Sequence, residues 1–497
     1  MRGPATRGVR ALLLLFLLAT LFPSSAEAHQ RLLRTEPARD SAAAAVPREL
    51  RLTFLEPVEL AFTRVELIGP DGEAVALGEA RLDAPEVLVV PLAGALRAGG
   101  YTVRWATASR DGHPVRGEYV FSIAADAAGL AAAPGADPAP GGEHGGAVTA
   151  PGRAPLPAGH HPAPSAPGAS FDADSPAYVA VRWITFVALL GVIGTVAFAL
   201  PILGLVGRGG LPAEGVLVAE SRRRAAALGL GFAALLAVAA LARLYAQSLA
   251  MHGGGGALDA ERVGAMLTRT VWGWGWMLQA AAAVVAAAGF ALARRGAAAG
   301  WALATLAALA LAPSAGLSGH AAAMTGTTGT LARVADALHV LAAGGWIGGL
   351  LVLMAAGVPA ALRMGEGGRG PAVAALVRAF SPAALTFAAV LVLTGTYAAV
   401  VHVGSVDALL GSRYGTVLLV KLGIFLLVFA AGAYNYLRVR SALGDDTGTA
   451  RLRRSATAEI AVGAAVLLVT AVLVATSPPD RVAHGDPSAA AEGSEPR

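Results

Sequence analysis

Three residues from two distant parts of the sequence carry donor atoms suited to one metal ion: His29, and the pair Asp111 and His113. Asp111 and His113 are two positions apart, so in an extended segment their side chains point to the same side, where one ion reaches both. Taken alone, an Asp-x-His pair is more typical of a polar turn before a strand than of a metal site. His29 reverses this balance because of the sequence that precedes it.

Residues 1–28 have the pattern of a secretory signal peptide, with a basic start, an apolar run and small residues at Ala26 and Ala28. The apolar run is about a dozen residues long, which is shorter than the roughly 20 that span a bilayer. Cleavage after Ala28 makes His29 the first residue, so that its α-amine and imidazole chelate one ion together. An amine, two imidazoles and a carboxylate suit tetragonal Cu(II).

The composition indicates a membrane protein that also has an exported part. The 497 residues are 55% hydrophobic and 14% charged, which is too apolar for a wholly soluble protein of this size. The chain has no cysteine, so N, O or Met ligands must hold any metal. The net charge of +5 does not indicate nucleic acid, because the basic residues lie mainly between the apolar segments. The abundance of Ala, Gly and Arg is typical of a GC-rich bacterial genome.

Residues 29–124 read as strands separated by turns. Gly69-Pro70-Asp71-Gly72 and Ala98-Gly99-Gly100 are turn signals. Short strands at this spacing predict a small β-sandwich or barrel. The alternating segments lie at 50–54, 65–68, 87–90, 101–105 and 119–123.

Five segments of this domain match the motifs of a known family. They are His29, Glu36-Pro37-Ala38, Leu52-Thr53-Phe54-Leu55-Glu56-Pro57-Val58, Gly100-Tyr101-Thr102-Val103-Arg104-Trp105 and Ser109-Arg110-Asp111-Gly112-His113-Pro114-Val115. Through them the domain resembles the CopC copper-binding proteins over nearly its whole length. The resemblance implies an all-β Greek-key fold, cupredoxin-like or Ig-like, that binds Cu(II) through His29, Asp111 and His113. Between Met1 and Met251 there is no methionine, so the Met-rich Cu(I) site of that family has no counterpart here.

The rest of the chain is predicted to be a linker, an all-α polytopic membrane domain of about eight helices and a tail. Residues 125–176 are dominated by Ala, Pro and Gly and cannot bury a core, so they should be disordered, as should residues 477–497. Residues 177–476 contain apolar segments long enough to span a bilayer. They centre on 178–206, 224–250, 271–293, 298–315, 332–358, 374–401, 415–437 and 457–476.

Basic residues set the expected topology. Arginines cluster after the first, third, fifth and seventh spans, which places those loops in the cytoplasm and the N-terminal domain outside. The signal peptide gives the same orientation, so we expect a multi-pass protein of the bacterial plasma membrane. His252, His320, His402 and His484 then fall on outer loops or the tail, which suggests a metal entry route facing the copper domain.

Span five is the expected chemical focus of the membrane domain. Asp336 and His339 share a helix face at i, i+3, and an ionisable pair inside a membrane helix marks a functional site by default. With His320 and His402 they form a candidate copper route, for Cu(I) or Cu(II). The alternative is structural: His339 hydrogen-bonds to a neighbouring helix, and Lys421 either snorkels to the membrane interface or pairs with Asp336.

Three segments of the membrane domain match the motifs of a second family. They are Ala337-Leu338-His339-Val340-Leu341-Ala342-Ala343-Gly344-Gly345-Trp346-Ile347-Gly348-Gly349, Lys421-Leu422-Gly423 and Asn435-Tyr436. Through them this half resembles the CopD copper-resistance membrane proteins. The resemblance covers mainly spans five to eight and implies copper handling at the membrane, with uptake into the cytoplasm.

The sequence therefore predicts a copper-trafficking protein that is not an enzyme, with the copper ion, the bilayer and periplasmic copper donors as partners and without nucleic acid. It has no Walker A motif, so ATP does not drive transport directly. One alternative is a periplasmic copper buffer or sensor on a membrane anchor. Another is a copper-brace oxidase, but the carboxylate of Asp111 would occupy a position that O₂ chemistry needs open.

Overall fold

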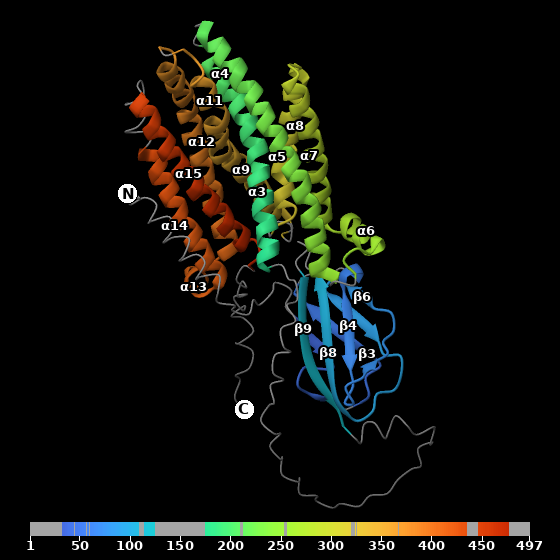
Figure 1. The fold of residues 1–497 in the computed structure, drawn as a ribbon. Helices are drawn as coiled ribbons and strands as arrows, with labels where there is room; N and C mark the ends of the chain where they lie inside the picture. Colours follow the sequence, from blue (N-terminus) through green and yellow to red (C-terminus); the bar gives the residue numbers. More distant parts are fainter. Residues whose placement is uncertain are drawn as a thin grey trace, which may run out of the picture.

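The chain folds into a β domain and a helical domain that lie end to end (Figure 1). This confirms the predicted fold class of an all-β region followed by a helical region. The structure is a computed structural model, and it describes residues 32–43, 45–55, 57–58, 60–108, 114–124, 174–208, 212–252, 256–319, 324, 326–365, 367–434 and 446–476.

Two sheets make up the β domain, and most sheet neighbours are not consecutive in the chain, as in a Greek key. The first sheet has the order β1 (Leu32–Glu36), β3 (Glu49–Phe54), β7 (Val87–Pro91) and β6 (Arg81–Ala84). The second has the order β2 (Ala42–Ala43), β9 (Pro114–Ile123), β8 (Gly99–Ala108), β4 (Arg64–Ile68) and β5 (Ala74–Val75).

The strand sequences explain the core between these sheets. Along β3 the side chains of Leu50, Leu52 and Phe54 are buried, because alternate residues of a strand face the same side. They pack against Leu67 of β4 and Val103 of β8, both fully buried. A 3₁₀ turn, η1 (Leu60–Phe62), precedes β4 and lies near the helical domain.

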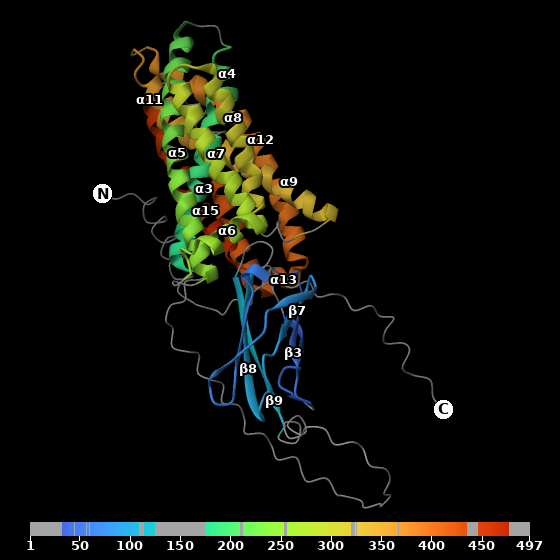
Figure 2. The ribbon, with the colours of Figure 1, turned by 90° about the vertical axis from the view of Figure 1, so that its right-hand side faces the viewer.

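The described part of the helical domain contains eight helices long and apolar enough to cross a membrane. Two short helices, α6 (Ala260–Arg269) and α13 (Val406–Gly411), lie at the end nearest the β domain in both views (Figures 1 and 2). The candidate spans are Pro176–Val206, which begins as α3 (Pro176–Ala197), α5 (Pro212–His252), α7 (Val271–Arg294), α8 (Ala298–Gly316), the span that begins as α9 (Gly326–Ala343) and ends at Ala361, α12 (Arg369–Val403), α14 (Arg413–Tyr434) and α15 (Asp446–Leu473).

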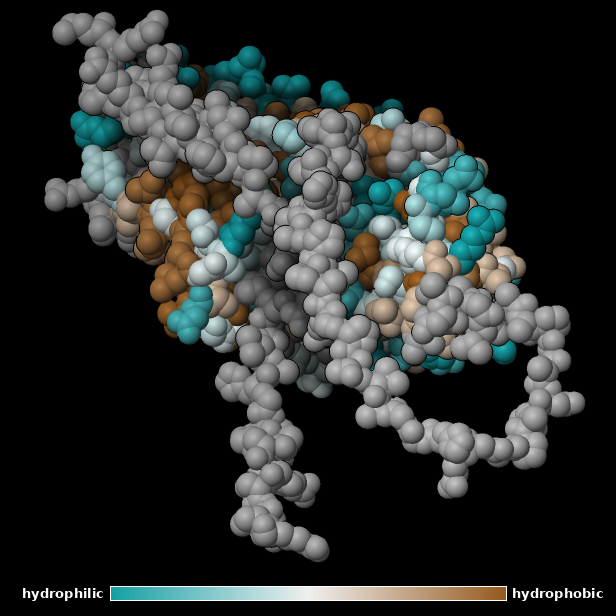
Figure 3. Space-filling view, turned by 90° about the horizontal axis from the view of Figure 1, so that it is seen from below, coloured by the Kyte–Doolittle hydropathy of each residue, from teal (hydrophilic) through white to brown (hydrophobic). Residues whose placement is uncertain are grey.

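The outer surface of the helices is suited to lipid. Leu393, Val400 and Leu426 are each more than 60% exposed, and many other large apolar side chains are exposed on the same helices. Viewed from the β-domain end, hydrophobic residues gather over the helical domain and hydrophilic residues over the β domain (Figure 3). A bilayer is the environment that such a helix surface requires.

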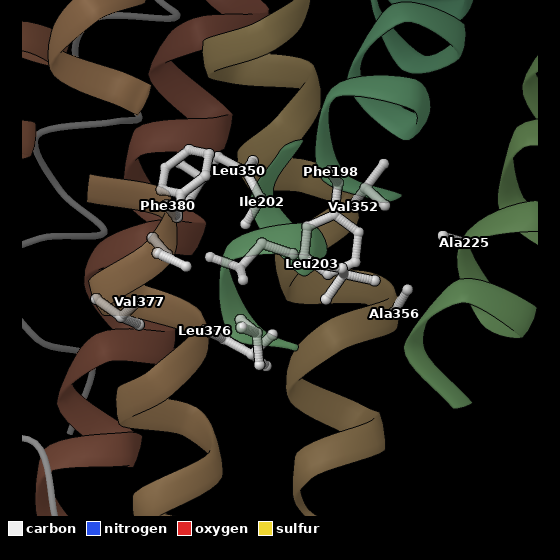
Figure 4. Packing of buried hydrophobic residues seen from close by; sticks show 14 of the residues in the cluster. Phe198, Ile202, Leu203, Ala225, Leu350, Val352, Ala356, Leu376, Val377 and Phe380 are labelled. Atoms are coloured by element: carbon white, nitrogen blue, oxygen red, sulfur yellow. The ribbon is translucent and has the colours of Figure 1, made fainter. Parts of the chain in front are cut away.

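Spans one and five are interrupted and in close contact. Each contains π-helical turns, at Phe198–Ile202 in span one and at Gly344–Gly348 and Leu353–Gly357 in span five. π-Helical turns often accompany functional sites. Phe198, next to Val352 and Ala356, lies in the main core cluster of the helical domain (Figure 4).

Candidate metal centre

The three predicted Cu(II) ligands lie outside the described residues, but the strands that flank them are described. His29 precedes β1 by three residues, and Asp111 and His113 fall between β8 and β9. Those two strands form one long hairpin, in which Ala108 pairs with Pro114 at its end. The predicted site therefore has two parts: the segment that leads into β1 and the segment that joins β8 to β9.

The strand register brings these two parts to the same end of the β domain. Leu32, the first residue of β1, is paired with Phe54 of β3. The ring of Phe54 packs edge-on against Trp105 of β8 with 5.1 Å between the ring centroids. Trp105 in turn pairs with Gly117, near the start of β9. The start of β1 and the two strand ends that flank the β8–β9 turn therefore lie at the same end of the β domain.

This end of the β domain faces the helices. The Arg116 guanidinium donates a hydrogen bond to the carbonyl oxygen of Ala250 in α5, with 2.9 Å between nitrogen and oxygen. A cleft of about 700 Å³ lies between the two domains, and its lining includes Trp105, Met251 and His252. The indole Nε1 of Trp105 is buried without a hydrogen-bond partner among the described residues.

In the helical domain, His339 of α9 is held by a hydrogen bond to Thr394 of α12, with 2.9 Å between Nδ1 and Oγ1. The single hydroxyl proton of Thr394 is donated to the carbonyl oxygen of Val390 at 2.7 Å, so Nδ1 of His339 must be the donor in the other bond. The lone pair is then on Nε2, the atom that a neutral imidazole offers to a metal.

Asp336, one turn before His339, adjoins two other helices. Its carboxylate interacts electrostatically with Lys421 of α14. A Cβ built on Gly316, the last residue of α8, would lie 3.4 Å from Cβ of Asp336. His320 lies outside the described residues, four positions after Gly316. The interactions of His339 and Asp336 are those of the structural alternative, and in the case of His339 they leave Nε2 available.

His402 lies beyond Thr394 in the last turn of α12, shortly before α13 in the chain. His402 is eight residues after Thr394, which corresponds to about 12 Å along the helix axis. Their side chains leave the helix in directions that differ by about 80°. The sequence places His252 and His402 on loops, but the structure shows both in the last turn of a long helix. Across the described ranges, no three His, Asp or Glu side chains are close enough to hold one metal ion.

Sequence reasoning missed Thr394, the residue that orients His339. The signal was a polar residue in the apolar run Leu391-Val392-Leu393-Thr394. A hydroxyl there has few partners in a bilayer, so it either bonds back to its own helix or bonds to a neighbouring helix. Thr394 does both.

Three parts of this chain match known protein families. The family described as CopC domain matches residues 32–124, and that described as copper resistance protein D matches residues 374–473. The family described as copper resistance protein D-like, N-terminal domain, matches residues 172–330.

Individual relatives match most of this chain or about a fifth of it. Copper transport protein CutJ of Bacillus subtilis (strain 168) is 29% identical over 481 residues, which are 94% of this chain and 78% of that protein. Copper resistance protein C of Pseudomonas syringae pv. tomato is 31% identical over 116 residues, 22% of this chain and 91% of that protein. The solved structure of PcoC, a copper resistance protein from Escherichia coli, is 31% identical and covers 19% of this chain and 98% of its own, with a TM-score of 0.18.

Proposed function

This chain belongs to the copper resistance proteins in which a CopC domain is joined to CopD domains, and we propose that it imports copper across the bacterial plasma membrane. In this proposal residues 1–28 are removed on export and residues 29–124 capture Cu(II) outside the cell. Residues 125–176 tether that domain to residues 177–476, which pass copper inward, and residues 477–497 form an outer tail. The chain binds and moves copper and catalyses no reaction.

The observation that carries this proposal is the position of the strand ends in the β domain. The start of β1, the end of β8 and the start of β9 lie at the same end of the β domain, which is the end that contacts α5. In the proposal, the α-amine and imidazole of His29, the carboxylate of Asp111 and the imidazole of His113 bind Cu(II) there. Copper held at this end has a short path to the helices.

The proposed route through the membrane domain uses the histidines on its outer side. Copper passes from His320 and His402 to Asp336 and His339, where Nε2 is the nitrogen free to bind it. Lys421 neutralises Asp336 when no copper is present, which lowers the cost of a carboxylate inside the membrane.

Copper uptake tests the transport step. Cells that express the full chain should contain more cytoplasmic copper than cells that express a chain lacking residues 177–476, because the exported domain alone has no path across the membrane. The copper content of washed spheroplasts is the measurement, with equal expression confirmed by immunoblot. Equal cytoplasmic copper in the two strains would support the anchored buffer or sensor instead.

The proposed Cu(II) site should also lose affinity in acid. Both imidazoles and the terminal amine must be deprotonated to bind, so protons compete with copper. Below about pH 6.5, the ordinary imidazole pKa, each histidine ligand should weaken binding by roughly tenfold per pH unit. A Cu(II) titration of the full chain between pH 7.5 and pH 5 measures this. Affinity that does not change over that range would exclude histidine ligands.

A further inference from the structure

The end of α5 contributes a methionine and a histidine to the cleft between the domains. Met251 and His252 are the last two residues of the helix, and both line the cleft. Across the cleft lies the β8–β9 hairpin of the β domain, and Arg116 bonds to the carbonyl of Ala250 just before them. The thioether and the imidazole that line this cleft are a soft and a borderline donor, both neutral.

The imidazole of His252 is oriented as a ligand. Its Nδ1 lies 3.2 Å from the hydroxyl of Ser248, one turn earlier in α5, and its ring packs against Phe62 of the β domain with 6.2 Å between centroids. Its Nε2 is buried without a hydrogen-bond partner in the described part of the chain. A buried, unsatisfied nitrogen requires an explanation. A metal ion on Nε2, with Nδ1–H donating to Ser248, would satisfy both nitrogens.

The charges around the cleft favour a monovalent ion over a divalent one. Four arginines but only two carboxylates line it, and both carboxylates flank Arg104. Glu118 is ion-paired with Arg104 at 3.3 Å, and Glu66 is its partner on the other neighbouring strand. The net positive charge repels a dication more strongly than a monocation, since the energy scales with the ion's charge. The charged lining residues are Arg64, Arg104, Arg116, Arg262, Glu66 and Glu118.

We propose that Met251 and His252 bind one Cu(I) ion in the cleft between the two domains. This rests on the proposed function for the identity of the cargo, and it adds a site that lies between the β domain and the membrane helices. Because there is no methionine between Met1 and Met251, the β domain has no thioether that would compete with Met251 for a Cu(I) ion in the cleft. The proposal concerns copper that arrives as Cu(I) and includes no electron transfer.

Copper binding to the purified full chain tests the site directly. Cu(I) is supplied without oxygen and in competition with a chromogenic Cu(I) chelator, to the wild type and to the variants His252→Ala and Met251→Leu. We expect each variant to bind this Cu(I) at least about tenfold more weakly, and X-ray absorption to show a Cu–S contact that is lost in Met251→Leu. Met277→Leu is the matched control, since Met277 is 38% exposed on α7 and is absent from the cleft lining.

Two outcomes would overturn the site: an unchanged Cu(I) stoichiometry and affinity in both variants, or a Cu–S contact that persists in Met251→Leu. Met251→Leu conserves volume and apolarity, so it remains informative if His252→Ala does not fold. Uptake separates this proposal from the proposed function. If the cells take up no copper but the purified protein shows a Met251-dependent Cu–S contact, import is refuted and the cleft site stands. If uptake is normal but this contact is absent, the cleft site is refuted and import stands.

Discussion

Replacing His113 by alanine should lower the Cu(II) affinity of the full chain by at least about 100-fold. The proposed site has few ligands, and even the loss of a supporting residue outside a metal's ligand shell typically costs 10- to 100-fold. The strand register supports this expectation, because the segment with His113 leaves β8 at the end where β1 begins. Competition with a Cu(II) chelator measures the affinity, and electron paramagnetic resonance reports the loss of nitrogen ligands.

Two further variants serve as comparisons. Asp111→Ala should have a smaller effect, since amine and imidazole nitrogens remain, whereas His144→Ala in the predicted linker should have none. Unchanged affinity in His113→Ala would reject the site. Mass spectrometry of the mature N-terminus belongs with this experiment, because only a chain that begins at His29 places an amine and an imidazole on one residue.

The strands of the β domain were predictable where their side chains alternate. The pattern at residues 50–54 identified β3, and the patterns at 101–105 and 119–123 identified the middle of β8 and the end of β9. The two strands extend further than predicted, because each stabilises the other over ten paired residues. That pairing depends on a partner and is not encoded in either strand alone.

Four other strands were not predicted. β2 and β5 have two residues each, so neither can show a period. β1 lies at a sheet edge with a buried residue only at every third position, Leu32 and Thr35, which does not resemble a strand pattern. β6, Arg81–Ala84, is another edge strand, and two of its four residues are charged. Edge strands often carry charged side chains, which discourage pairing with another chain.

The membrane spans were predictable because the bilayer sets a minimum apolar length. The residues at which the helices begin and end were less predictable. Arg222, Arg223 and Arg224 lie inside α5, which at 41 residues extends about 60 Å, twice the hydrocarbon thickness. Arginine forms helices well, so a basic stretch marks the membrane edge without ending the helix.

The candidate sites were predictable as residue types but not as contacts. Asp336 and His339 were identified because ionisable groups in an apolar run are unusual. The Thr394 hydroxyl that selects the tautomer of His339 comes from another helix. The burial of His252 likewise depends on Phe62 from the other domain. Such pairings require the tertiary structure.

Gly348→Ala should destabilise the helical domain by about 3 kcal/mol or more, the upper part of the range for overpacking. A Cβ on Gly348 would lie 2.1 Å from the carbonyl oxygen of Leu190, and one on Gly194 would lie 2.1 Å from the backbone of Gly348. Spans one and five therefore touch through their backbones, and neither can yield as a flexible side chain would. Thermal unfolding of the purified full chain in detergent should show a clearly lower melting temperature.

Gly231→Ala is the matched control for this contact. Gly231 is also in a helix, α5, but it is exposed and a Cβ there would meet no atom within 4 Å. Alanine should therefore stabilise that position by up to about 1 kcal/mol through its higher helix propensity. Equal melting temperatures for Gly348→Ala and the wild type would contradict the close approach of the two spans. Because span five also carries Asp336 and His339, Gly348→Ala should reduce copper uptake as well, whereas Gly231→Ala should preserve it.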